Sequence, residues 1–125
     1  MKTVVSTKNA PGAIGPYSQA TICNGVVYVS GQIPLDPVSG EISQGDITEQ
    51  TTRVLNNIKA IVEAAGSDMS KALKATVLLT DMGDFATMNE AYKKFFPENP
   101  PARMCYEVSA LPRGAAVEID LFCAL

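Results

Sequence analysis

The chain has 125 residues, of which 46% are hydrophobic and 18% are charged, and its formal net charge is −3. This length fits a single domain over residues 1–125, and the composition excludes an intrinsically disordered chain. An acidic chain is poorly suited to binding the phosphate backbone of a nucleic acid, so we expect no nucleic-acid partner. The chain contains no histidine, which excludes Ser-His and Cys-His nucleophilic pairs and HExxH zinc sites.

The first third of the chain predicts three strands. Val4 and Val5 indicate a short first strand, and Asn24-Gly25 is a strong turn signal between two apolar runs. Residues 17–23 and 26–32 are therefore expected to form a hairpin. The second arm is β-branched and apolar on both faces, which is typical of a central strand.

A long amphipathic helix is expected next. Asp46 with Glu49 resembles a capping box, and Gly66 stands where a helix C-cap belongs. Between them, apolar residues recur at helical spacing: Val54, Leu55, Ile58, Ile61, Val62 and Ala65.

The remaining residues predict a strand, a helix and two further strands. Residues 75–80 form an apolar run, and Asp84 is the expected cap of a second helix. That helix carries one apolar stripe and ends before a group of prolines. The stripe consists of Phe85, Met88, Tyr92 and Phe95. With final strands at 103–108 and 116–125, this order predicts an α+β fold, a mixed sheet with both helices on one face.

Alternation along the last two strands sorts their polar side chains. Arg103, Cys105 and Glu107 share one face of their strand, and Glu118 shares a face with Asp120. Ionisable groups in apolar strands require a reason, because an unpaired buried charge is costly. The residues alone leave two explanations open: a structural ion pair between Arg103 and Glu118, or a binding or catalytic site.

The three cysteines, Cys23, Cys105 and Cys123, form no CxxC pair. Neither a disulfide framework nor a zinc ribbon is expected, and a reducing compartment is favoured. No apolar run reaches the length of a membrane helix, and the first residues lack the apolar core of a signal peptide. We therefore expect a cytoplasmic protein without a membrane partner.

Five short segments carry a resemblance to a known family. Residues 15–20 (GPYSQA), 29–34 (VSGQIP), 89–92 (NEAY), 101–103 (PAR) and 117–119 (VEI) resemble the RidA (YjgF-like) family of reactive-intermediate deaminases. They occur in the family's order and spacing, and the resemblance covers essentially the whole chain. One departure is Met104, where the family usually has a small Ser or Thr.

The resemblance implies a chorismate-mutase-like α+β domain. It further implies a homotrimer with the sheets packed inward and a ligand site in each of three subunit clefts. The implied enzyme is a 2-iminobutanoate/2-iminopropanoate deaminase, which hydrolyses 2-imino and enamine acids to 2-keto acids and ammonia. No metal and no cofactor are implied.

The resemblance also assigns residues to that reaction. Arg103 would bind the substrate carboxylate through two hydrogen bonds from its planar guanidinium, and Glu118 would hold and activate a water molecule. For Cys105, a packing and backbone role is expected. The other implied substrate-binding residues are Tyr17, Ser30, Gly31 and Asn89.

Two alternatives belong to other classes of protein. A non-catalytic, small-carboxylate-binding or chaperone-like trimer would use Arg103 in the same way and would not need Glu118. RNA cleavage fits poorly, because the chain is acidic, lacks histidine and shows no basic stripe with interleaved aromatic residues.

Overall fold

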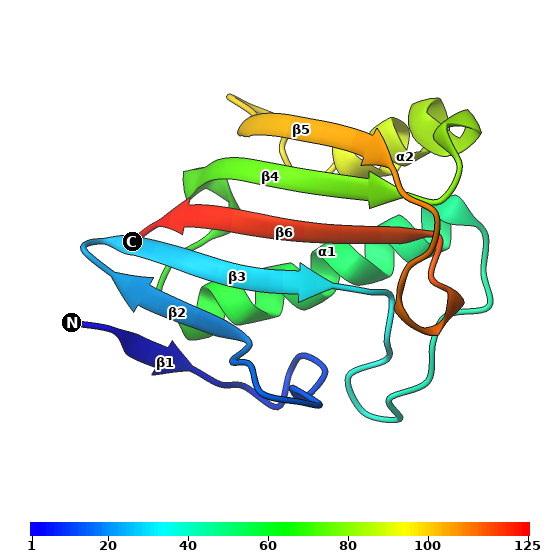
Figure 1. Ribbon diagram of the computed structural model, residues 1–125. Coiled ribbons are helices and arrows are strands. Elements are labelled where there is room, and N and C mark those ends of the chain that lie inside the picture. Colours follow the sequence, from blue (N-terminus) through cyan, green and yellow to red (C-terminus); the bar gives the residue numbers. More distant parts are fainter.

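Six strands form one mixed sheet, and two helices cover one of its faces (Figure 1). The computed structural model describes residues 1–125. The strands are β1 (Thr3–Val5), β2 (Ala20–Cys23), β3 (Val26–Gln32), β4 (Ala72–Leu79), β5 (Ala102–Glu107) and β6 (Val117–Ala124). The helices are α1 (Ile47–Ala64) and α2 (Phe85–Tyr92). The α+β class and the placement of both helices on one face are confirmed.

The last strand lies in the middle of the sheet. The strand order is β1-β2-β3-β6-β4-β5, and β6 pairs antiparallel with both β3 and β4. Strands β4 and β5 are parallel and are connected through α2. Because β3 is flanked by β2 and β6, its expected interior position is confirmed.

The predicted hairpin forms around a left-handed pair of residues. Asn24 and Gly25 have φ values of 50° and 76°, as a type I′ turn requires. The first arm is shorter than expected, because β2 begins at Ala20 and residues 17–19 belong to the preceding loop.

The buried Gln19 side chain explains why this arm is short. Its Oε1 accepts the Thr7 N–H at 2.7 Å, and its Nε2 donates to the carbonyls of Thr7 at 3.0 Å and Pro11 at 2.8 Å. These bonds hold the N-terminal loop beside the sheet. A local sequence pattern does not contain them, because the partners lie 8–12 positions away along the chain.

Both ends of α1 are capped as the sequence predicts. The Asp46 carboxylate accepts the Glu49 N–H at 2.9 Å. At the other end Gly66 has φ 89° and donates to Glu63 O, while Ser67 donates to Val62 O. This pair of bonds is a Schellman motif, which needs a left-handed residue where Gly66 stands.

The boundaries around α2 differ in detail from the expectation. Strand β4 begins at Ala72, three residues early, because Leu73 and Lys74 are exposed and hide the pattern of a buried strand. Asp84 stands at the N-cap of α2 but its side chain makes no cap bond; Asp81, at the preceding 3-10 turn, accepts the Gly83 N–H instead.

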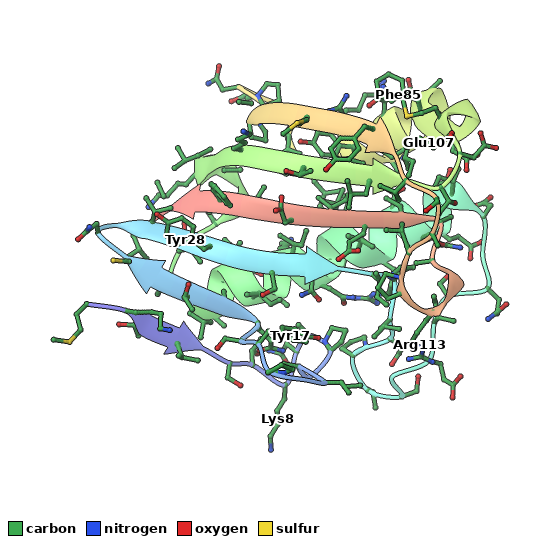
Figure 2. The ribbon with its side chains drawn as sticks, viewed as in Figure 1. Lys8, Tyr17, Tyr28, Phe85, Glu107 and Arg113 are labelled. Carbon is green, nitrogen blue, oxygen red and sulfur yellow. The ribbon has the colours of Figure 1, made fainter.

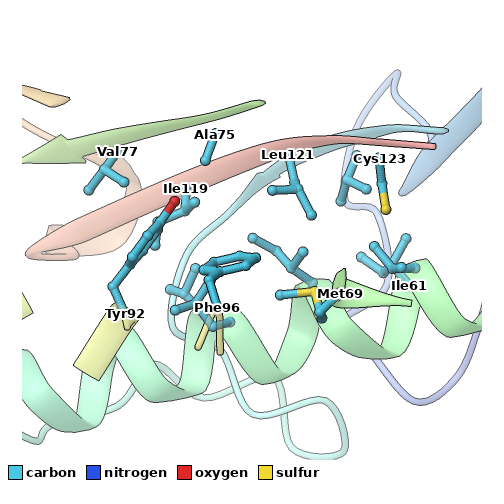
Figure 3. Packing of buried hydrophobic residues seen from close by; sticks show 14 of the residues in the cluster. Ile61, Met69, Ala75, Val77, Tyr92, Phe96, Ile119, Leu121 and Cys123 are labelled. Carbon is cyan, nitrogen blue, oxygen red and sulfur yellow. The ribbon is translucent and has the colours of Figure 1, made fainter. Parts of the chain in front are cut away.

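The core lies between the sheet and the helices (Figure 3). It contains 21 buried hydrophobic residues, among them Val27 and Val29 of β3, Val77 of β4, and Ile119 of β6. On the other side of the sheet, which we call the open face, no helix covers the strands. Large apolar side chains there are between 39% and 47% exposed: Tyr28, Met104, Tyr106 and Phe122. No helix is both long and apolar enough to cross a membrane.

We expect Gln19→Leu to destabilise the fold by about 2–4 kcal/mol, because it leaves several part-buried backbone groups of the N-terminal loop without partners. Urea unfolding followed by circular dichroism measures this. Gln44→Leu is the matched control, since Gln44 is exposed. Equal midpoints for the two variants would show that the loop does not depend on Gln19.

Candidate active site

The residues assigned from the sequence fall into two separate groups. The first lines a hollow of about 370 Å³ on the open face, next to the N-terminal loop. Figure 2 views this face, with Tyr28 on β3 and Tyr17 on the loop beside it. The hollow is bounded by Tyr17, Ser30, Gly31, Ile33, Pro112 and Glu118.

The second group lies beside α2. Asn89 and Arg103 line a hollow of about 350 Å³ together with Tyr92, Phe96 and the two prolines that follow the helix. The two hollows share no residue. Cys105 belongs to this group, because it is two residues after Arg103 on the same face of β5.

Arg103 and Glu118 lie on opposite faces of the sheet. Arg103 pairs in register with Ala75, which is 1% exposed and faces the helices. Glu118 stands between Val117 and Ile119, which are both buried in the core, so its side chain points to the open face. A structural ion pair between Arg103 and Glu118 is therefore wrong for a single chain. The one ion pair in the structure joins Lys93 and Glu90 on the surface.

The Arg103 guanidinium has no acidic partner. Its Nη1 donates to Asn89 Oδ1 at 2.7 Å, and its Cζ lies 4.9 Å from the Tyr92 ring centroid and 5.5 Å from that of Phe85. Glu107 shares its strand face, but Glu107 Oε1 accepts the Met82 N–H at 2.8 Å. A half-buried positive charge without a carboxylate is suited to binding an anionic ligand.

The Cys105 thiol is kept protonated by its surroundings. Burial raises the pKa of this thiol, and the nearby Arg103 charge only partly opposes that effect. A reactive cysteine needs the opposite shift, toward the thiolate. The environment agrees with a packing role for Cys105 and not with a nucleophilic one.

Glu118 is a half-buried carboxyl beside a second acid. Burial raises its pKa, and the negative charge of Asp120 on the same face of β6 raises it further. Asp120 is itself fixed, because its Oδ1 accepts the Thr76 N–H at 2.9 Å. A carboxylate with a raised pKa is a stronger base than an ordinary glutamate, and it can take a proton from a bound water molecule.

A β-bulge in β3 makes room for Glu118. Val29 pairs with Leu121 and Gln32 with Ile119, so Ser30 and Gly31 together oppose Asp120. A Cβ on Gly31 would collide with Glu118 Oε2. The Glu118 carboxylate can therefore lie where it does only because residue 31 has no side chain.

Ser30 and Tyr17 are joined to the N-terminal loop. Ser30 Oγ donates its proton to Ser18 O at 2.6 Å, so it can only accept a hydrogen bond from a ligand. Tyr17 is half exposed, and its hydroxyl accepts the Ile14 N–H at 3.4 Å. Ser30 thus fixes the loop that carries Tyr17 above the hollow.

The candidate residues of one chain therefore lie on both sides of the sheet. Arg103, whose free charge suits an anion, lies on the helix side of β5 at the edge of the sheet, and Glu118, whose raised pKa suits a base, lies on the open face. Within one chain the two side chains do not line a common hollow. No three histidine, cysteine, aspartate or glutamate side chains are grouped closely enough to hold a metal ion.

Several residues that line these hollows or contact Arg103 were not predicted as site residues from the sequence. Phe85 and Tyr92 were expected only as core, although their spacing to Asn89 on α2 places all three on one helix face. Ile33 lies within one of the family-like segments but was assigned no role, and Pro112 lines the hollow from a 3-10 turn that carries no local signal of a site.

Comparisons with known proteins agree over nearly the whole chain. The family model described as Endoribonuclease L-PSP matches residues 7–125. A RutC family protein of Sinorhizobium fredii is 53% identical over 97% of this chain and 96% of its own. The human 2-iminobutanoate/2-iminopropanoate deaminase is 48% identical over 96% of this chain and 88% of its own. The crystal structure of E. coli TdcF with bound serine superposes with a TM-score of 0.94 at 43% identity, over 98% of each chain.

We expect Asp120→Asn to lower the pKa of Glu118. The amide keeps an oxygen for the Thr76 N–H and removes the like charge that disfavours the Glu118 carboxylate. In a pH titration followed by carboxyl ¹³C NMR, the Glu118 midpoint should move to lower pH. Glu63→Gln is the control, because it makes the same charge change on the exposed side of α1. An unmoved midpoint would show that burial alone sets the Glu118 pKa.

Proposed function

Because the chain belongs to the Endoribonuclease L-PSP family, also called RidA or YjgF-like, we propose that it hydrolyses reactive 2-imino acids to 2-keto acids and ammonia. The observation that carries the proposal is the Arg103 guanidinium, which is half buried and has no acidic partner. The human relative named for 2-iminobutanoate and 2-iminopropanoate supports the same substrate class.

Arg103 binds the substrate carboxylate. Its planar guanidinium offers two parallel N–H donors that match the two oxygens of a carboxylate, and a lysine ammonium does not. Asn89 holds one edge of the guanidinium and leaves the others for the ligand. This fixes the imine carbon, which is bonded directly to the carboxylate carbon, at one distance from the arginine.

Glu118 activates the water. Its carboxylate takes a proton as the water oxygen bonds to the imine carbon, and the C=N double bond becomes a single bond. That proton passes to the nitrogen and gives a carbinolamine, in which one carbon carries both the hydroxyl and the amino group. Glu118 then takes the hydroxyl proton and delivers it to the nitrogen, so the C–N bond breaks and ammonia leaves as the C=O bond of the keto acid forms. Imines of this kind hydrolyse without a catalyst, so holding one water against one anchored carbon meets a modest demand.

The other residues shape the cleft. Tyr17 and Ser30 line the Glu118 hollow, and Ile33 and Pro112 give it a small apolar wall that suits the methyl or ethyl group of 2-iminopropanoate or 2-iminobutanoate. The neutral Cys105 thiol packs beside Arg103.

The active molecule is a homotrimer in this proposal. The open face carries Tyr28, Met104, Tyr106 and Phe122, which is more exposed apolar surface than an isolated monomer usually keeps. Packing these faces together supports a cyclic assembly in which Glu118 of one copy meets Arg103 of the next. Each of three interfaces then holds one complete site.

The two alternative functions require different features of the chain. A carboxylate-binding or chaperone-like trimer would use Arg103 but gain nothing from Glu118. RNA cleavage, which the family description names, is disfavoured by a net charge of −3 and the absence of histidine.

The direct test generates 2-aminoacrylate with a serine dehydratase and follows imine decay with and without the protein.

We expect Arg103→Lys to stay folded and trimeric, at three times the chain mass of 13.2 kDa, and to lose most activity. It should also lose thermal stabilisation by pyruvate, since a ligand stabilises the state that it binds. A variant that unfolds readily or stays fully active would make Arg103 structural.

Mixed trimers test the shared site. Glu118→Gln should be inactive while still binding pyruvate, because an amide cannot accept the proton from water. Refolding equal amounts of Arg103→Lys and Glu118→Gln together should restore about one quarter of the parent activity, since every mixed cyclic trimer contains one intact interface. No restored activity would place both residues in a site within one chain or outside catalysis. Turnover by Glu118→Gln alone, at the parent rate, would favour the binding protein.

A further inference from the structure

The Arg103 side chain is held by groups that carry no charge. Its contacts are the amide oxygen of Asn89 and the rings of Tyr92 and Phe85. A buried arginine is usually fixed by a carboxylate, which also cancels its charge. Here the nearest candidate on the strand, Glu107, is bound to the Met82 N–H. The orientation of the Arg103 guanidinium therefore depends on its uncharged neighbours.

The three contacts come from one face of α2. Phe85, Asn89 and Tyr92 are separated by four and three positions, so their side chains lie in a row along the helix. Figure 2 shows Phe85 at the end of the sheet where Glu107 lies, and the contacts with Arg103 place this face of α2 against β5. One short helix thus supplies two ring contacts and one hydrogen bond to a single guanidinium.

Tyr92 contributes its ring and not its hydroxyl. The side chain is 6% exposed, and its hydroxyl is buried without a hydrogen-bond partner. Burial raises the pKa of this phenol, so the ring remains uncharged. Phe96 packs against Tyr92 with ring centroids 4.8 Å apart, which fixes the ring plane under Arg103. Figure 3 shows the Tyr92 ring and Phe96 within the buried cluster.

We propose that Phe85 and Tyr92 are positioning residues that orient Arg103 for the substrate carboxylate while leaving its charge free. The inference rests on the proposed function, in which Arg103 binds that carboxylate. An acidic residue in their place would also orient the guanidinium, but it would compete with the ligand. Aromatic faces attract a cation without supplying an opposing carboxylate.

The test compares ring-preserving and ring-removing variants. Tyr92→Phe keeps the ring and removes the unpaired hydroxyl, and we expect its pyruvate Kd to stay within about twofold of the parent. Tyr92→Leu and Phe85→Leu should each weaken pyruvate binding, measured by calorimetry, by about five- to tenfold. The KM for 2-iminobutanoate should rise by a similar factor, with a smaller change in kcat.

Two controls separate positioning from general loss of structure. Met88→Ala removes a fully buried side chain from the same helix without touching the ring contacts of Arg103. It should lower Tm while its pyruvate Kd stays unchanged. If Tyr92→Leu does not fold, Tyr92→Met, which fills similar space without a ring, takes its place.

Each outcome decides the inference. Parent-like Kd and KM values in folded Leu or Met variants would overturn it, as would a Tyr92→Phe variant as weak as Tyr92→Leu. Pyruvate binding that follows the presence of the rings, in a parent protein without imine hydrolysis, would keep the positioning role and refute the proposed reaction. A parent that binds no carboxylate would refute both.

Discussion

Alternation along β6 is the constraint on which the rest of the structure depends. This strand lies between β3 and β4, and Val117, Ile119 and Leu121 on its helix side are completely buried. Glu118 must therefore face the other way, because turning the strand over would take its core residues into water. The edge strand β5 carries Arg103 toward the helices. Glu118 and Arg103 are thus held apart by the same packing that stabilises the fold, and in the proposed trimer each chain would contribute to two neighbouring sites.

The unpaired Arg103 shows how this fold separates stability from binding. A carboxylate partner would lower the cost of burying a guanidinium, and its absence leaves the empty site less stable than it would otherwise be. Rings and an amide reduce that cost without neutralising the charge. The remaining attraction is available to a ligand. Stability lost at a binding site in this way is a common consequence of function.

Much of the fold follows from local signals, and the rest depends on contacts between distant segments. The Asn24-Gly25 turn and the long helix were predictable because their determinants lie within a few residues. The loop before β2 was not, because Gln19 binds backbone groups far along the chain. Alternation sorted the side chains of each strand into faces, but only the register between the strands shows that Arg103 and Glu118 face opposite sides. The contact of Tyr92 with Arg103 was hidden because a ring in an apolar helical stripe has the pattern of core.

The bulge in β3 limits how this strand can change in length during evolution. Two residues, Ser30 and Gly31, occupy the space opposite Asp120, so both Val29 before them and Gln32 after them face the helices. Losing one of the pair would restore a regular ladder with a single residue opposite Asp120, and the bulge that makes room for Glu118 would be lost. Gaining one would leave three residues opposite Asp120 and enlarge the break in the ladder. Insertions and deletions in relatives should therefore collect in the loops on either side, and the spacing between the hairpin turn and the residues that contact Glu118 should stay constant.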